Sequence, residues 1–193
     1  MGIYEFAGCV VSYEPLYGLL RRRMETYRSD TEGQPDITLD GTKEDYEKLR
    51  KQYPHLSIEE CEYSCAGAEF YMKLLKHQGF MIHASAVEKE GKAYLFSAPS
   101  GTGKSTHAQL WRQTFKGEPI RIINDDKPAV CLQNGVFYAC GTPFSGKTDK
   151  NENRKAPIQG LCMLHRGKTN KIQKITSGEA LPLILPQTLF YGD

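Results

Sequence analysis

The fold is decided by the stretch YLFSAPSGTGKSTHAQLW, residues 94–111. It begins with an apolar run typical of a strand, passes through a glycine-rich turn and ends with the apolar spacing of a helix. The end of the turn, residues 103–106 (GKST), matches the second half of the G-x-x-x-x-G-K-[ST] pattern. The first glycine of that pattern is replaced by Ala98, and Pro99 follows it. The sequence therefore predicts a phosphate-binding loop with an altered entrance.

The residue types in this turn suit the phosphates of a nucleotide. Gly101 and Gly103 let the backbone turn its N–H groups toward anionic oxygens, and the helix that follows adds its positive dipole end. Lys104 is expected to contact the β and γ phosphates, and Ser105 to bind Mg²⁺. The predicted ligand is ATP with Mg²⁺. The expected binding residues are Ala98, Pro99, Ser100, Gly101, Thr102, Gly103, Lys104, Ser105 and Thr106.

Two adjacent acids, Asp125 and Asp126, follow the next predicted helix and strand. Carboxylates at the C-terminal end of a strand can hold Mg²⁺ and accept the proton of an attacking hydroxyl. We expect Asp126 to share the metal with Ser105. Either aspartate can be the base, because the sequence does not resolve the roles within a coupled pair. The alternative is a solvated turn before Lys127.

Two further features are candidates for the same site. His83 lies in the run MIHASA, in a strand predicted to pair with the strand that enters the loop, so it is expected near the aspartates, where it would tune their protonation. A purely structural histidine is an equal alternative. The polar segment GTPFSGKTDKNENRK, residues 141–155, is either a loop that contacts phosphate or gates substrate, or an exposed hairpin tip.

The apolar patterns predict a mixed α/β chain. The turn EKEG and the pair Asn134-Gly135 each indicate a hairpin, so the strand entering the phosphate loop should be antiparallel to its predecessor, unlike the all-parallel sheets of common phosphate-loop folds. Capping signals predict helices that begin after Thr42 and after Ser57. The expected strands are 3–13, 35–39, 80–87, 92–97, 120–123, a hairpin in 127–140, 158–167 and 171–176. The expected helices are 14–29, 42–54, 57–79, 106–116 and 177–185.

Length and composition limit the class of protein. With 193 residues, 39% of them hydrophobic, the chain suits one domain plus an appendage, and we place the boundary near residues 76–80. The N-terminal part, 1–76, is predicted to be α+β, and the core is 77–193. A net charge of +2 gives no general attraction to nucleic acid or membrane. The first residues lack the charge pattern of a signal peptide, so a cytoplasmic location with reduced, mostly buried cysteines is expected.

A resemblance strengthens this interpretation. The segments HASAV (83–87), SGTGKST (100–106) and INDD (123–126) together resemble the kinase domain of bacterial HPr kinase/phosphorylase and its relatives with a phosphoenolpyruvate-carboxykinase-like fold, over roughly residues 80–165. The resemblance implies a mixed α/β core whose loop binds the triphosphate. It also implies that an Asp acts as base toward a serine hydroxyl of a protein substrate. By position, the implied site residues are His83, Lys104, Ser105, Asp125 and Asp126.

The function expected from the sequence is an ATP-dependent kinase that transfers the γ-phosphate to a hydroxyl, with serine the preferred acceptor. A small-molecule kinase of the same fold and a non-catalytic nucleotide-binding switch are the alternatives. The expected partners are a peptide, a protein or a small molecule that bears the hydroxyl, and not nucleic acid or a membrane. Association into a homo-oligomer is left open.

Overall fold

A seven-stranded mixed sheet forms the centre of the protein in the computed structural model, which describes residues 1–115 and 117–189. The strand order is β4-β8-β9-β10-β6-β5-β7, and within this described sheet only the β6–β10 pair is parallel. This confirms the predicted mixed α/β class. The strands are β4 (Gly79–Met81), β5 (Ala84–Lys89), β6 (Lys92–Ser97), β7 (Arg121–Asn124), β8 (Ala129–Gln133), β9 (Val136–Cys140) and β10 (Lys155–Met163).

Both predicted hairpins are present in this sheet. β5 and β6 pair antiparallel through a turn in which Glu90 (φ 52°) and Gly91 (φ 73°) have left-handed backbones. The β8–β9 turn has the same geometry at Asn134 (φ 50°) and Gly135 (φ 79°). The strand that enters the phosphate loop is therefore antiparallel to its predecessor, as predicted.

The helix after the loop, α4 (Lys104–Thr114), begins two residues earlier than predicted because Gly103, with φ 118°, is its N-cap. Its predicted end, Lys116, lies outside the described residues. The helix packs on the sheet through Trp111, whose ring centroid is 5.0 Å from that of Tyr94 and 5.2 Å from that of Phe96. This contact fixes the start of the helix above the end of β6.

Three predicted strands differ in the structure. The run 3–13 is two antiparallel strands, β1 (Gly2–Phe6) and β2 (Cys9–Tyr13), because the left-handed pair Ala7-Gly8 reverses the chain. The run 80–87 is split at residues 82–83, because β4 pairs with β8 whereas β5 pairs with β6 and β7. The run 171–176 is not a strand: it pairs with no described strand, and Ile172 is 88% exposed.

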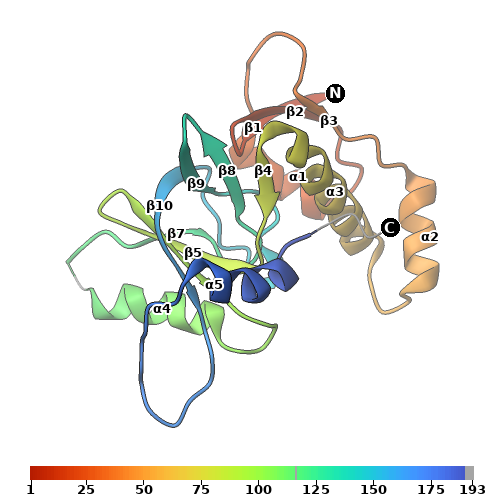
Figure 1. Ribbon diagram of the computed structural model, residues 1–193. Helices are drawn as coiled ribbons and strands as arrows, with labels where there is room; N and C mark the ends of the chain where they lie inside the picture. Colours follow the sequence, from red (N-terminus) through yellow and green to blue (C-terminus); the bar gives the residue numbers. More distant parts are fainter. Residues whose placement is uncertain (116, 190–193) are drawn as a thin grey trace.

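The N-terminal part combines a small sheet with three helices. β1, β2 and β3 (Ile37–Thr38) form the sheet. The helices α1 (Gly18–Met24) and α3 (Ile58–Leu74) lie near it, and α2 (Lys43–Gln52) packs on α3 farther out (Figure 1). The capping box predicted at Ser57 is present, and the helix start predicted at Thr42 is also a capping box, with Asp45. The left-handed residue that ends the long helical segment is Gln78 (φ 56°) rather than the predicted Gly79, which begins β4. Near the C-terminus, α5 (Ser177–Ile184) confirms the last predicted helix.

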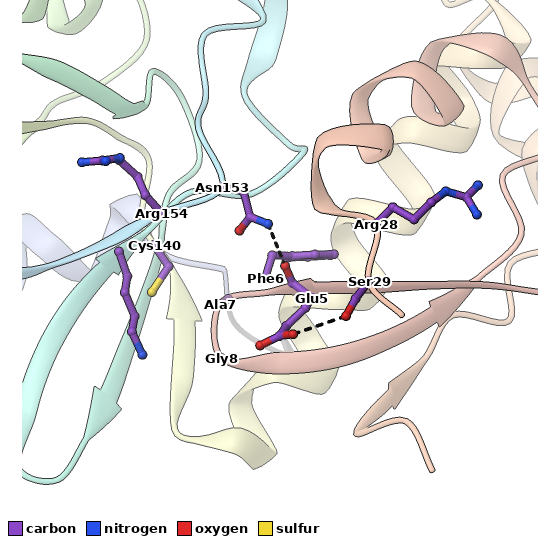
Figure 2. Close-up of a pocket in the computed structure, with 10 residues that line it drawn as sticks. Glu5, Phe6, Ala7, Gly8, Arg28, Ser29, Cys140, Asn153 and Arg154 are labelled. Carbon is purple, nitrogen blue, oxygen red and sulfur yellow. Dashed lines mark hydrogen bonds between the residues drawn. The ribbon is translucent and has the colours of Figure 1, made fainter. Parts of the chain in front are cut away.

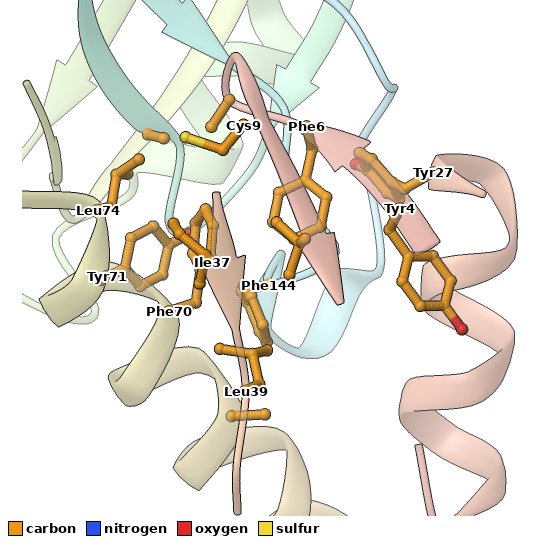
Figure 3. Packing of buried hydrophobic residues seen from close by; sticks show 14 of the residues in the cluster. Tyr4, Phe6, Cys9, Tyr27, Ile37, Leu39, Phe70, Tyr71, Leu74 and Phe144 are labelled. Carbon is orange, nitrogen blue, oxygen red and sulfur yellow. The ribbon is translucent and has the colours of Figure 1, made fainter. Parts of the chain in front are cut away.

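A shared hydrophobic core joins the N-terminal part to the seven-stranded sheet. Figure 3 shows Phe6 of β1, Phe70 of α3 and Phe144, from the segment after β9, pointing toward one another. The ring centroids of Phe6 and Phe70 are 4.7 Å apart, and those of Phe70 and Phe144 are 5.9 Å apart. The domain boundary near residues 76–80 stays a prediction. Residues before it and residues after it contribute buried side chains to the same cluster.

Two properties expected from composition can be compared with the structure. All six cysteines are free thiols and four of them are buried, as predicted. Among the described residues, no helix has the length and apolar character needed to cross a membrane.

Candidate active site

The phosphate-loop segment forms an open turn between β6 and α4. Gly101 (φ 76°) and Gly103 (φ 118°) adopt left-handed backbones, and a Cβ built on either glycine meets no atom within 4 Å. The N–H of Thr102 donates to the carbonyl of Pro99 at 3.3 Å, which closes the first turn. Glycine is thus needed at 101 and 103 for conformation, and the space beside them is free for a ligand.

Ala98 occupies the position of the missing first glycine without strain. It is fully buried and does not have the left-handed backbone that would favour glycine. Its carbonyl accepts a hydrogen bond from Nζ of Lys104 at 2.9 Å, and Lys104 is only 7% exposed. Burial lowers the pKa of Lys104, and the charges of Asp126 and Asp125 act in the opposite direction. The lysine and the two carboxylates therefore lie close enough to interact.

Asn124, which the sequence analysis missed, shapes the turn that carries the aspartates. Its Oδ1 accepts hydrogen bonds from the N–H of Asp126 at 3.0 Å and of Lys127 at 2.8 Å. Its Nδ2 donates to the carbonyl of Thr142 at 3.1 Å. An Asn at the end of a strand, before two acids, is a recognisable signal for such a turn.

The two aspartates have different environments. Asp125 is 2% exposed, and both of its carboxylate oxygens accept hydrogen bonds. Oδ1 accepts from Ser85 Oγ at 2.9 Å and Oδ2 from Thr148 Oγ1 at 2.9 Å. Asp125 thus fastens its turn to β5 and to the loop after β9. Neither Ser85 nor Thr148 was expected at the site, because the contacts depend on how distant segments pack.

Asp126 is the aspartate that remains accessible, with its side chain 28% exposed. Its Oδ1 lies 3.3 Å from Nε2 of His83, and its Oδ2 lies 3.7 Å from Nζ of Lys127. Burial alone would raise the pKa of Asp126, but the hydrogen bond with His83 and the charges of Lys127 and Lys104 outweigh burial and hold the pKa below its ordinary value. Asp126 is thus an ionised acceptor that faces a histidine and a buried lysine.

The donors available for a metal are the hydroxyl of Ser105, in the first turn of α4, and the carboxylate of Asp126. The described residues contain no group of three or more His, Cys, Asp and Glu side chains that would form a complete cage. One carboxylate and one hydroxyl suit Mg²⁺, which is bound by few protein groups and completes its shell with phosphate and water oxygens.

A pocket of about 430 Å³ opens beside the phosphate loop. It is bordered by the loop backbone, by the outer face of α4 and by the segment after β10. Arg166 in that segment donates a hydrogen bond to the carbonyl of Gly101, and burial lowers the pKa of His107. The sequence analysis missed this segment, because only the parallel pairing of β10 with β6 brings it here. The lining residues are Gly101, Thr102, Gly103, Thr106, His107, Leu110, Leu164, His165 and Arg166.

A second pocket, of about 290 Å³, lies at the β1–β2 turn. Figure 2 shows the guanidinium ends of Arg28 and Arg154 pointing in opposite directions, away from the pocket centre. Asn153 donates to the carbonyl of Glu5 at 3.2 Å, and Glu5 lies near Ser29. The charged groups of this second pocket do not converge. The phosphate loop with its neighbouring pocket is therefore the better candidate site.

Comparison with known proteins gives no match to a family model and no match to a curated protein.

Proposed function

We propose that this protein is an ATP-dependent kinase that transfers the γ-phosphate to a hydroxyl, with a serine side chain as the preferred acceptor. The observation that carries the proposal is that the contacting pair Asp126 and His83 lies at the end of β6, where the carbonyl of His83 accepts a hydrogen bond from Ser97 at 2.9 Å. The open turn that follows β6 leads to the buried Lys104. A buried lysine, an accessible carboxylate and left-handed glycines are the parts that phosphoryl transfer requires. The resemblance of these segments to the HPr kinase family supports the same reaction.

The role of each residue follows from its surroundings. Asp126 accepts the proton of the acceptor hydroxyl, whose oxygen forms a bond to the γ-phosphorus as the bond to the β–γ bridging oxygen breaks and ADP leaves. His83 orients the carboxylate through Oδ1. Lys104 balances the charge of the phosphates once it leaves the carbonyl of Ala98. Ser105 and Asp126 would hold Mg²⁺, which supplies positive charge to the triphosphate.

The pocket beside the loop suits the nucleoside end of ATP. Its volume of about 430 Å³ is within the range of small-molecule sites, and it adjoins the turn at Gly101 and Gly103 directly. Leu110 and Leu164 supply apolar surface, and Arg166 supplies a planar cation for stacking on a base. The phosphates and the base can therefore occupy adjoining regions.

The test measures Mg·ATP binding and phosphate transfer from γ-labelled ATP to serine peptides and to small-molecule alcohols. Lys104→Ala should weaken Mg·ATP binding about 10- to 100-fold, because hydrogen bonds to charged groups are worth about 1.5–3 kcal/mol. Asp126→Asn should lose about 10²- to 10⁴-fold in transfer rate, and it should weaken Mg·ATP binding less than Lys104→Ala does, because Ser105 and the phosphates would still hold Mg²⁺. Lys92→Ala, at the exposed start of β6, is the control and should match the wild-type protein.

Three outcomes distinguish the candidates. Transfer to a serine peptide that disappears in Asp126→Asn supports the proposal. Transfer only to a free alcohol points to a small-molecule kinase. Tight Mg·ATP binding without transfer or hydrolysis would replace the kinase with a nucleotide-binding switch.

A further inference from the structure

The segment after β9, residues 141–154, lies between the aspartates and the N-terminal part. It contains a short 3-10 turn, Gly146–Thr148. On the sheet side, Thr148 donates to Oδ2 of Asp125 at 2.9 Å, and the N–H of Asp125 donates to the carbonyl of Lys150 at 3.0 Å. The segment is therefore attached to the turn that carries both aspartates, although residues 147–150 are exposed.

Gly146, in this segment, lies directly beside Asp126. Its backbone is left-handed (φ 68°), and a Cβ built on it would stand 2.7 Å from Oδ2 of Asp126. Only glycine therefore allows the backbone to approach the carboxylate this closely. Gly146 therefore forms the surface next to Oδ2 of Asp126, whereas Oδ1 faces His83.

Two side chains of the N-terminal part hold Gly146 in place. Arg23, in the last turn of α1, donates from Nη2 to the carbonyl of Gly146 at 2.8 Å, and its Nε lies 3.1 Å from Oδ1 of Asp149. The N–H of Gly146 donates to the hydroxyl of Tyr63, in α3, at 2.9 Å. The guanidinium carbon of Arg23 is 4.8 Å from the centroid of the Tyr63 ring. Both backbone groups of Gly146 are thus bonded by residues more than 80 positions away.

The surroundings of Arg23 indicate a specific attachment. Its side chain is 9% exposed, so the charge is largely removed from water. A buried cation is costly unless a carboxylate, hydrogen bonds or an aromatic face compensate for it, and here all three are present. The neighbouring Arg22 and Arg21 are exposed. The sequence RRR at 21–23 gives no sign that only the third arginine reaches the site.

We propose that Arg23 is a positioning residue of the phosphoryl-transfer site, and that the N-terminal part thereby completes the active site by fixing Gly146 against Asp126. The inference rests on the proposed kinase function. Arg23 touches neither the phosphate loop nor the pocket beside it. Its loss should therefore lower the rate of the chemical step and leave the apparent affinity for Mg·ATP unchanged.

The experiment follows the hydrolysis of Mg·ATP, with water as the acceptor, together with amide hydrogen exchange at residues 145–151. In Arg23→Ala, kcat should fall about 10- to 100-fold, since small displacements of reacting groups have effects of this size. KM for Mg·ATP should stay within about twofold of the wild-type value, and exchange at Gly146 should accelerate. Arg22→Ala, which removes the same charge from the next position, should leave all three quantities unchanged.

Two further variants separate positioning from a general loss of structure. Arg23→Lys keeps the charge and one donor, so it should restore part of kcat. Tyr63→Phe removes the hydroxyl that accepts from the N–H of Gly146 and contacts Arg23, but keeps the ring, so it should lower kcat without unfolding the protein. A pH–rate profile that keeps its shape while its height falls would show that the base itself is unaltered.

The outcomes keep this inference apart from the proposed function. An active wild-type protein whose kcat is unchanged in both Arg23→Ala and Tyr63→Phe overturns the positioning role and leaves the kinase intact. A wild-type protein that neither binds nor hydrolyses Mg·ATP overturns the kinase. In that case, unchanged exchange at Gly146 in Arg23→Ala would also refute the attachment, whereas faster exchange would support it.

Discussion

Asp125 and Asp126 are adjacent in the sequence, yet their side chains differ in burial and in hydrogen-bond partners. Asp125 has both oxygens bonded to hydroxyl groups and is buried, whereas Asp126 faces His83 and Lys127 and remains accessible. This difference favours Asp126 as the base. Asp125 is better suited to hold the turn in place, a role that its bonds to Ser85 and Thr148 support directly.

The lowered pKa of Asp126 predicts how this residue affects stability as pH changes. Its pKa in the folded protein is below the ordinary value of 3.8, so between these two values the unfolded chain binds more protons. The stabilising contribution is therefore present above pH 3.8 and is lost as pH falls through the folded pKa. The difference in unfolding free energy between the wild-type protein and Asp126→Asn should rise with pH in this acid range. Urea unfolding from about pH 2.5 to 7 measures it, and a flat difference would contradict the assigned environment.

At the scale of elements, helix α1 depends on a residue of α3. The N-cap of α1, Tyr17, makes no capping bond with its own side chain. Instead Glu62, fully buried in α3, accepts hydrogen bonds from the N–H groups of Leu16 at 2.5 Å and Tyr17 at 3.1 Å, and from the hydroxyl of Tyr13 at 3.0 Å. The carboxylate thus holds the two residues that precede α1 and sets the direction of the helix that carries Arg23.

Glu62→Ala should lower the free energy of unfolding by about 1–3 kcal/mol, because it removes the acceptor of the part-buried N–H groups of Leu16 and Tyr17 and one partner of the buried Tyr13 hydroxyl. The change should also reduce the protection of Gly146 from exchange, since α1 carries Arg23. Urea unfolding and amide exchange measure the two effects. Glu47→Ala, on the exposed face of α2, is the matched control. Equal stability of the two variants would show that Glu62 does not anchor α1.

At the scale of the whole molecule, the aromatic cluster makes the two parts of the chain depend on each other. Phe144 is 1% exposed and packs against Phe6, Tyr63, Phe70 and Tyr71. It lies in the segment 141–154, two residues before Gly146, which borders Asp126. The contacts that join the two parts are therefore the same contacts that support one wall of the candidate site.

Phe144→Ala should lower the free energy of unfolding by about 3–5 kcal/mol, the cost typical of removing a buried phenylalanine. The wild-type protein should unfold in a single transition, because the N-terminal part and the sheet share this core. Calorimetry together with circular dichroism measures both properties. Phe137→Ala, at a side chain that is 51% exposed, should change stability little. Two separate transitions in the wild-type protein would favour independent domains, in line with a boundary near residues 76–80.

The sequence by itself determined the features that depend on neighbouring residues. The glycines at 101 and 103, the capping boxes at Thr42 and Ser57 and the Asn134-Gly135 turn all act within a few positions, where backbone conformation and local hydrogen bonds decide the outcome. The turn at Ala7-Gly8 is the exception, because Ala rarely adopts a positive φ and so gave no signal of a reversal.

Only the tertiary structure decided which aspartate is accessible, which segment borders the phosphate loop and which arginine reaches Gly146. Arg23 and Gly146 are 123 positions apart, and their contact exists because α1 and α3 pack on the same aromatic cluster as Phe144. Such contacts depend on the packing of whole elements. A local pattern such as RRR at 21–23 does not distinguish an arginine that extends into water from one that reaches the site.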